Sequence, residues 1–119
     1  MSREYLYKAK RTDTGEWVQG YYVYFRNTEN HCIYYEIRGI TLVCDIDEKT
    51  LCQYTEVLDK NRKKIWENDK CVVRRPGVSA YGAIKYIEGS FCFVEDNTNT
   101  IIRLSDLKIN NYEIGVVEE

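Results

Sequence analysis

Turn-forming residues interrupt this chain at short intervals, so few of its segments are long enough to form a helix. The segments between the turns are rich in aromatic and β-branched residues, which favour strands. Polar or glycine-containing breaks fall at residues 12–15, 27–30, 45–49, 58–64 and 96–99. Apart from one short helical turn, with Ser105 as its predicted N-cap, no stretch keeps a 3.6-residue period. The chain is therefore predicted to be mainly β.

The strand pattern changes in character about half-way along the chain. Residues 1–49 predict an antiparallel meander with a bend at Gly20, and residues 50–119 predict short strands with one helical turn, as in a small SH3-like barrel. Residues 78–81 are expected to form a loop tip after Pro76 and Gly77. No linker separates the halves, so we expect the meander to pack on the barrel as one domain spanning residues 1–119.

The residues that usually carry catalysis or bind metals do not form a recognisable motif here. Five cysteines at wide spacings lie among apolar neighbours, which predicts reduced thiols packed as small hydrophobic groups. The single histidine, His31, precedes Cys32, and neighbours on a strand point to opposite faces. Asp45, Asp47 and Glu48 lack the glycine and the alternating ligands of a calcium loop. We therefore predict no catalytic residues, no metal, no cofactor and no enzymatic activity.

Tyrosine is strongly over-used, with eleven residues against three phenylalanines. A tyrosine on a strand covers the core with its ring and reaches water with its hydroxyl, so strand packing accounts for most of this excess. The alternative is an aromatic contact face for a protein partner or for nucleobases.

A basic segment at residues 60–75 holds seven basic and two acidic side chains, although the formal net charge of the chain is only −2. Cations beside rings such as Trp66 and Tyr54 are typical of nucleic-acid backbone sites. Residues 86–119 are acidic in turn, so the two segments could instead attract each other, and a solvated turn is a further alternative. The candidate binding residues are Lys60, Arg62, Lys63, Lys64, Trp66, Arg74 and Arg75.

The central segment carries a family resemblance. Residues 53–72, from Gln-Tyr-Thr-Glu through Asp-Lys-Asn-Arg-Lys-Lys-Ile to Trp-Glu-Asn-Asp, resemble the signature of the YopX family of phage and prophage proteins. Residues 3–21 and the later segments 91–94 and 112–115 are similar to the same family, so the resemblance covers nearly the whole chain. Its motif indicates structure more than chemistry, and the residues assigned to it are Gln53, Tyr54, Asp59, Asn61, Trp66 and Asp69.

The chain departs from this family pattern at three positions where the pattern has glycine, namely Glu56, Arg62 and Asn68. If these positions need a positive φ angle, asparagine tolerates it at modest cost, whereas glutamate and arginine tolerate it less well. The resemblance implies a β-type fold ending in an SH3-like barrel and an origin in phage or prophage genomes. It implies no activity.

These observations together predict a non-catalytic accessory protein of a phage or prophage. We expect it to act by binding a protein partner or a second copy of itself, with nucleic-acid binding through residues 60–75 as the alternative. No segment approaches the roughly 18 apolar residues of a membrane span, and the first residues lack the apolar region of a secretion signal. We therefore expect no membrane association and a location in the bacterial host cytoplasm.

Overall fold

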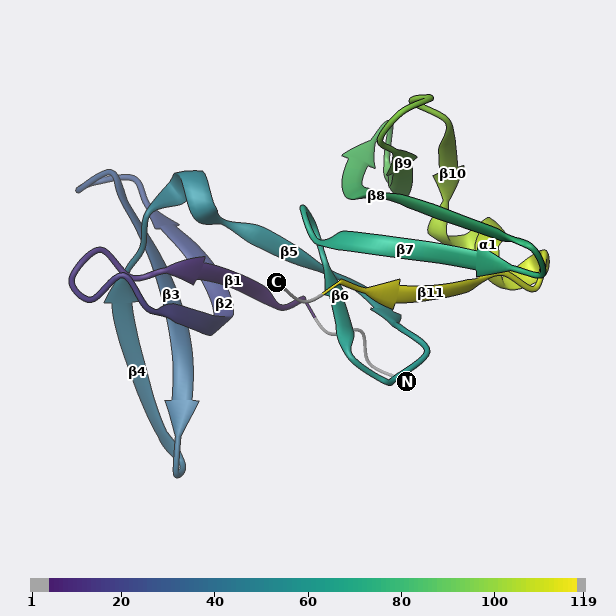
Figure 1. Cartoon of the computed structure of the whole chain (residues 1–119). Helices are drawn as coiled ribbons and strands as arrows, with labels where there is room; N and C mark the ends of the chain where they lie inside the picture. The colour runs from purple at the N-terminus through teal and green to yellow at the C-terminus, as the bar shows by residue number, and fades with distance from the viewer. Residues whose placement is uncertain (1–4, 118–119) are drawn as a thin grey trace. The chain divides into compact units, whose positions relative to one another are not determined.

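The computed structural model describes residues 5–117, and the chain divides into two compact units, Met1–Tyr54 and Thr55–Glu119. The predicted mainly β class is confirmed (Figure 1). In the first unit the elements are β1 (Tyr7–Lys10), β2 (Trp17–Phe25), β3 (Asn30–Ile37), β4 (Ile40–Asp45) and the 3-10 turn η1 (Glu48–Thr50). Strand β5 (Cys52–Leu58) begins in the first unit and ends in the second. The second unit continues with β6 (Lys64–Trp66), β7 (Lys70–Arg75), β8 (Val78–Ile87), β9 (Ser90–Glu95), β10 (Ile101–Arg103), α1 (Leu104–Ile109) and β11 (Glu113–Val116).

The first unit is an antiparallel meander in the order β4-β3-β2-β1, with the start of β5 beside β1. An antiparallel bridge between Arg11 and Ile46 also joins the end of β1 to the residue that follows β4. The sheet therefore curls, and its concave side holds a small core of Ala9, Ile33, Cys44 and Ile46. Because only alternate residues of each strand face this core, the opposite side of the sheet carries the other half of the side chains.

Gly20 is the point at which β2 changes partner. Residues 17–20 pair with β1, whereas residues 21–25 pair with β3. A Cβ atom at Gly20 would lie 2.0 Å from the carbonyl oxygen of Tyr34, so glycine is required for β3 to approach this closely. The bend predicted at this residue thus has its physical cause in the close approach of two backbones.

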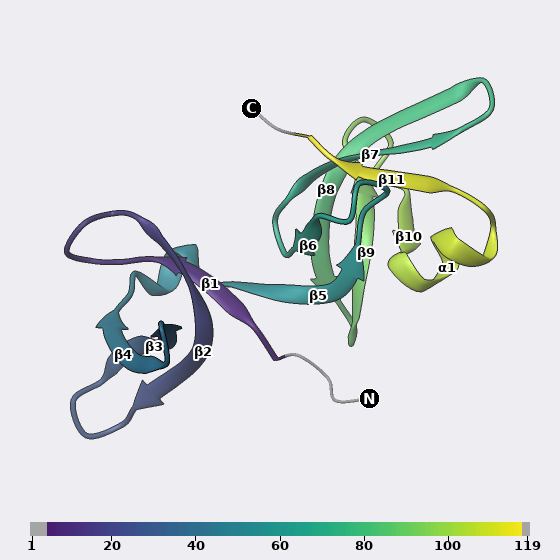
Figure 2. The same ribbon diagram turned by 90° about the horizontal axis from the view of Figure 1, so that it is seen from below.

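The second unit is built on a five-stranded antiparallel sheet in the order β10-β9-β8-β7-β11. Its core gathers on one face of this sheet and includes Ile65, Ile84 and Phe93, with Leu104 and Leu107 of α1 packed against them. Figure 2 shows α1 between β10 and β11, at the side of the sheet.

The predicted closure of this half into an SH3-like barrel is wrong, because the sheet stays open, with β10 and β11 as its two edges. Closure would need β11 to pair along its outer edge with another strand. That edge is instead bonded to the turn after β5: Lys60 N donates to Ile114 O at 3.0 Å, and Val116 N donates to the carboxylate of Asp59. A side chain and a turn therefore satisfy the edge that another strand would otherwise cover.

Two local predictions also need correction. Residues 78–81 do not form a loop tip: Pro76 and Gly77 make a two-residue turn, and β8 begins at once with Val78 paired to Arg75. Gly77 has a φ of 79°, which the second central position of such a turn requires. Ser105 is not the N-cap of the helix but lies inside α1, which begins at Leu104.

The three positions at which the chain departs from the glycines of the family pattern all have a left-handed backbone. The φ angles are 68° at Glu56, 65° at Arg62 and 72° at Asn68. A non-glycine residue in this region is strained by roughly 1–2 kcal/mol, less for asparagine. Glutamate and arginine therefore hold a conformation here that glycine adopts freely.

Glycine at position 62 is expected to stabilise the second unit. Arg62→Gly removes the left-handed strain but adds flexibility to the unfolded chain, so the free energy of unfolding should rise by about 0.5–1 kcal/mol. Urea unfolding followed by circular dichroism measures the change. Arg62→Ala is the matched control, because it removes the same side chain and keeps the strained φ. A gain of the same size for Arg62→Ala would show that the side chain, and not the backbone, is the source of the effect.

Candidate functional site

The family motif folds around one buried carboxylate, that of Asp59. The residue is 6% exposed and lies at the end of β5. Its Oδ1 accepts hydrogen bonds from the backbone N–H groups of Asn61 and Lys63, both at 2.8 Å. Its Oδ2 accepts one from Val116 N at 3.0 Å. Burial by itself raises the pKa of Asp59, but these three donors outweigh it and hold the pKa below its ordinary value. The charged Asp59 thus joins the turn of residues 59–63 to β11.

The second conserved-type corner of the motif is closed by Asp69, as predicted. The Oδ2 of Asp69 accepts a hydrogen bond from Trp66 N at 2.9 Å, and Asp69 N donates to Trp66 O at 3.1 Å. Ile84 N donates to the carbonyl oxygen of Asp69, and Asn68 N donates to Ile84 O. The corner between β6 and β7 is thereby bonded to β8. Gln53 pairs with Tyr7 across β1 and β5, so every motif position for which a bond is printed acts in the framework of the fold.

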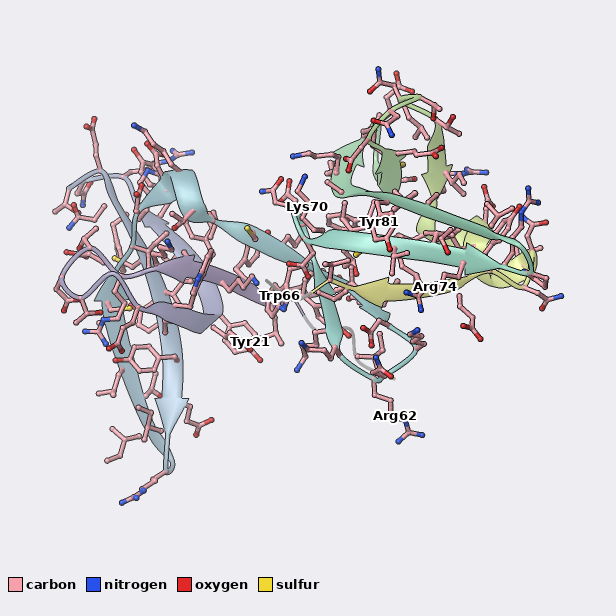
Figure 3. All side chains as sticks on the ribbon, in the orientation of Figure 1. Tyr21, Arg62, Trp66, Lys70, Arg74 and Tyr81 are labelled. Atoms are coloured by element: carbon pink, nitrogen blue, oxygen red, sulfur yellow. The ribbon has the colours of Figure 1, made fainter. Side chains whose placement is uncertain are left out.

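The basic segment does not present all its side chains on one face. Lys60, Arg62, Lys63 and Lys64 are exposed around the turn between β5 and β6, and Figure 3 shows Arg62 extending away from it. Arg74 and Arg75 are neighbours on β7 and therefore point to opposite sides of the sheet. Arg75 bonds the hydroxyl of Tyr112 at 3.1 Å. The rings that the hypothesis needs, Trp66 and Tyr54, are only 5% and 6% exposed.

A smaller cationic surface does form on the open face of the second unit. The β7–β8 register places Val72 opposite Tyr81 and Arg74 opposite Ser79, so Lys70, Arg74 and Tyr81 lie on the same face of the hairpin (Figure 3). Tyr81 is 54% exposed. Lys70 and Arg74 form no ion pair or hydrogen bond with any residue of the described range 5–117. Tyr81 was missed from the sequence because residues 78–81 were assigned to a loop.

The convex side of the first unit carries an exposed aromatic row. The register of β2, β3 and β4 aligns Tyr21 with Tyr34 and Tyr34 with Val43. Tyr21 is 59% exposed and Val43 is 52% exposed, and the half-buried Tyr34 lies between them. Phe25 of the same face packs edge-on against Tyr34, with ring centroids 6.4 Å apart. We call Tyr21, Phe25, Tyr34 and Val43 the aromatic row.

His31 belongs to a short chain of polar contacts that the sequence did not reveal. Its Nδ1 lies 2.6 Å from the hydroxyl of Tyr22, and its Nε2 lies 2.9 Å from the carboxylate of Glu48. The tyrosine and the imidazole are stacked, with an interplanar angle of 9°. The imidazole thus joins β2, β3 and the η1 turn, which is a framework role for a side chain that is 25% exposed.

The cysteine thiols are held in the protonated form that is poorly nucleophilic. All five cysteines are unpaired and buried, as predicted. Burial raises the pKa of Cys71 to about 12 and, together with a hydrogen bond to Asp45, the pKa of Cys32 to about 11. Cys32 contacts Asp45 on one face of β3 whereas His31 contacts Tyr22 on the other, so thiol and imidazole are held apart.

Two further kinds of site were sought in the described part of the chain. Within residues 5–117, no group of three or more histidine, cysteine, aspartate or glutamate side chains is placed to hold a metal ion. A hollow of about 440 Å³ in the second unit is lined by Thr55, Phe91, Leu104 and Ser105 among others, and it contains no charged side chain. In the same residues, no helix is long and apolar enough to cross a membrane.

Comparison with known proteins places the chain in a family. A search of curated proteins and a search of solved structures each find no match. The family model described as YopX protein matches residues 6–117, which include the Asp59 turn, the Asp69 corner and both sheets. Because this match covers nearly the whole sequence, the chain belongs to the YopX family.

Proposed function

We propose that this protein is a non-catalytic binding module, acting as an accessory protein of a phage or prophage in the host cytoplasm. The observation that carries the proposal is the aromatic row, in which tyrosine and valine side chains are exposed side by side on a rigid sheet. Tyrosine is enriched at protein interfaces because its ring covers a large area at a low cost in conformational entropy. Such a group, exposed on the surface of a protein, marks a contact surface.

The titratable groups support a binding role over a chemical one. The carboxylates of Asp59 and Asp69 are used by backbone donors, and the thiols are buried with raised pKa values. The imidazole of His31 is held between Tyr22 and Glu48. A catalytic nucleophile instead needs a base within hydrogen-bond reach and a reactive ionisation state.

Capture of partners from infected cells tests this proposal. The double variant Tyr21→Ser with Val43→Ser should lose most of the protein captured by the wild type from nuclease-treated lysate, because it removes the two most exposed members of the aromatic row. Tyr81→Ser is the matched control, since it removes an equally exposed tyrosine from the other unit. Capture that is unchanged in the double variant would contradict the proposal.

Nucleic-acid binding is the second candidate, and the open face of the second unit favours it. Lys70 and Arg74 are cations without an ion-pair partner in the described range, and the exposed ring of Tyr81 lies on the same face. If this surface binds a single strand, Lys70→Ala with Arg74→Ala should weaken retention of a labelled oligonucleotide and lower its salt dependence by about 0.7 per lost phosphate contact. No retention at low salt would remove this candidate.

A further inference from the structure

Strand β4 is the most accessible edge among the described strands. The edge of β11 is bonded to Asp59 and Lys60, and β6 and β10 are only three residues long. Strand β4 has six residues, and from Ile40 to Cys44 it contains neither a charge nor a proline. Proteins usually protect an edge with charges, prolines, bulges or short strands, so an unprotected edge is suited to pairing with another strand.

The turn before β4 determines which backbone groups are free. Arg38 and Gly39 both have positive φ angles, of 51° and 81°, and form a two-residue hairpin turn closed by the pair Ile37 and Ile40. In such a hairpin the closing pair is hydrogen-bonded, so even-numbered residues of β4 bond β3 and odd-numbered ones point outward. The outward carbonyl of Asp45 accepts from Thr12 N at 3.1 Å, which agrees with this assignment.

The N–H and C=O groups of Thr41 and Val43 are therefore directed away from the sheet. No residue of the described range donates to or accepts from them. Both side chains lie on the convex face, so that the edge is continuous with the aromatic row through Val43.

We propose that the partner bound at this edge is a second copy of the chain, paired through β4 about a two-fold axis at Leu42. This inference rests on the proposed binding function and names its partner. In an antiparallel pairing, Thr41 of one copy faces Val43 of the other, and the reverse, so that four backbone hydrogen bonds form. Leu42 then faces its own counterpart, and Ile40 faces Cys44.

Charge complementarity supports this register. Continuing it outward places Asp45 of one copy opposite Gly39 of the other, next to Arg38. Both charged side chains are exposed, and the two-fold axis repeats the pairing at each end. Apolar side chains meet apolar ones in the centre and opposite charges meet at both ends, so the strand is complementary to itself.

Sedimentation of the full-length protein tests the proposal. The wild type is expected to be a reversible dimer that dissociates between about 100 µM and 1 µM, as fits a small interface. Val43→Lys places a charge on the paired edge and should weaken the dimer by at least about tenfold. Ile101→Lys is the matched control, because Ile101 is equally exposed on the edge strand β10. Circular dichroism of each variant establishes that it is folded.

Charge reversal and cross-linking test the register itself. Arg38→Glu should weaken the dimer, and adding Asp45→Lys in the same chain should restore it. Leu42→Cys should form a disulfide between copies under mild oxidation, because directly opposite residues without mutual hydrogen bonds have Cα atoms about 4.5 Å apart. Val43→Cys, two residues out of register with its own counterpart, should not.

Two results would overturn the self-pairing: a wild type that is monomeric at about 100 µM, or a dimer that Val43→Lys and Arg38→Glu leave unchanged. Neither result removes the proposed function, because capture of a different protein through Tyr21 would still be measurable. Conversely, loss of Tyr21-dependent capture with an intact β4 dimer would remove the wider binding role and leave the dimer.

Discussion

Replacing Gly82 by alanine is expected to destabilise the second unit by about 3 kcal/mol or more. The added Cβ would lie 2.1 Å from Val94 O and 2.9 Å from the ring of Phe93. Gly82 pairs with Cys71 on one side and with Glu95 on the other, so the central strand β8 cannot move away without disturbing both neighbours. The backbone oxygen has no rotamer with which to avoid the contact. Urea unfolding followed by circular dichroism measures the loss.

A second glycine of the same sheet gives the matched control. Gly89 lies in the turn between β8 and β9, and a Cβ there meets nothing within 4 Å, although its φ of 86° disfavours alanine. Gly89→Ala should therefore cost only about 1–2 kcal/mol, the strain of a left-handed alanine. Equal losses for the two variants would show that close strand approach at Gly82 is not a determinant of stability.

Asp59→Ala is expected to cost about 3–5 kcal/mol, because it leaves three backbone N–H groups without their carboxylate acceptor. The turn of residues 59–63 and the edge of β11 should loosen together. Asp59→Asn keeps the size of the side chain but loses the charge, so we expect an intermediate loss. A change below about 1 kcal/mol for Asp59→Ala would contradict the central role assigned to this carboxylate.

The same residue gives the protein a dependence on acid. The folded-state pKa of Asp59 is lowered relative to an unfolded value of about 3.9, so its contribution to stability is fully present above that value. The contribution is lost as the pH falls from about 4 through the folded pKa. Asp59→Asn should remove this part of the acid dependence, which unfolding curves at neutral pH and near pH 3 would measure. An unchanged slope would mean that other carboxylates determine it.

The strand positions could be predicted from the sequence because turn residues are local signals. The break at residues 27–30, for example, lies between β2 and β3, although β3 itself begins at Asn30. The three missing glycines also indicated strained positions, and all three φ angles are positive. Closure of the second half could not be predicted in the same way. It depends on whether β11 meets another strand or the Asp59 turn, and that choice is made by contacts distant in sequence.

The candidate surfaces were harder to predict because they depend on register. Alternation alone gives two sides of a strand, but not which residues of neighbouring strands share a side. Tyr81 joined Lys70 and Arg74 only once Pro76 and Gly77 proved to be a two-residue turn, which determines the pairing of β7 with β8. Trp66 was expected at the surface with the basic segment, but it is 5% exposed, and nothing local in the sequence distinguishes the two outcomes.

Site-specific photo-cross-linking tests most directly whether the first unit carries the contact surface. A photoreactive phenylalanine analogue replaces Tyr21 in one variant and Tyr81 in another, two tyrosines of similar exposure on different units. After irradiation in infected cells and nuclease treatment, we predict discrete protein adducts at position 21 and none at position 81. Adducts confined to position 81, or adducts that nuclease removes, would contradict a binding role for the aromatic row.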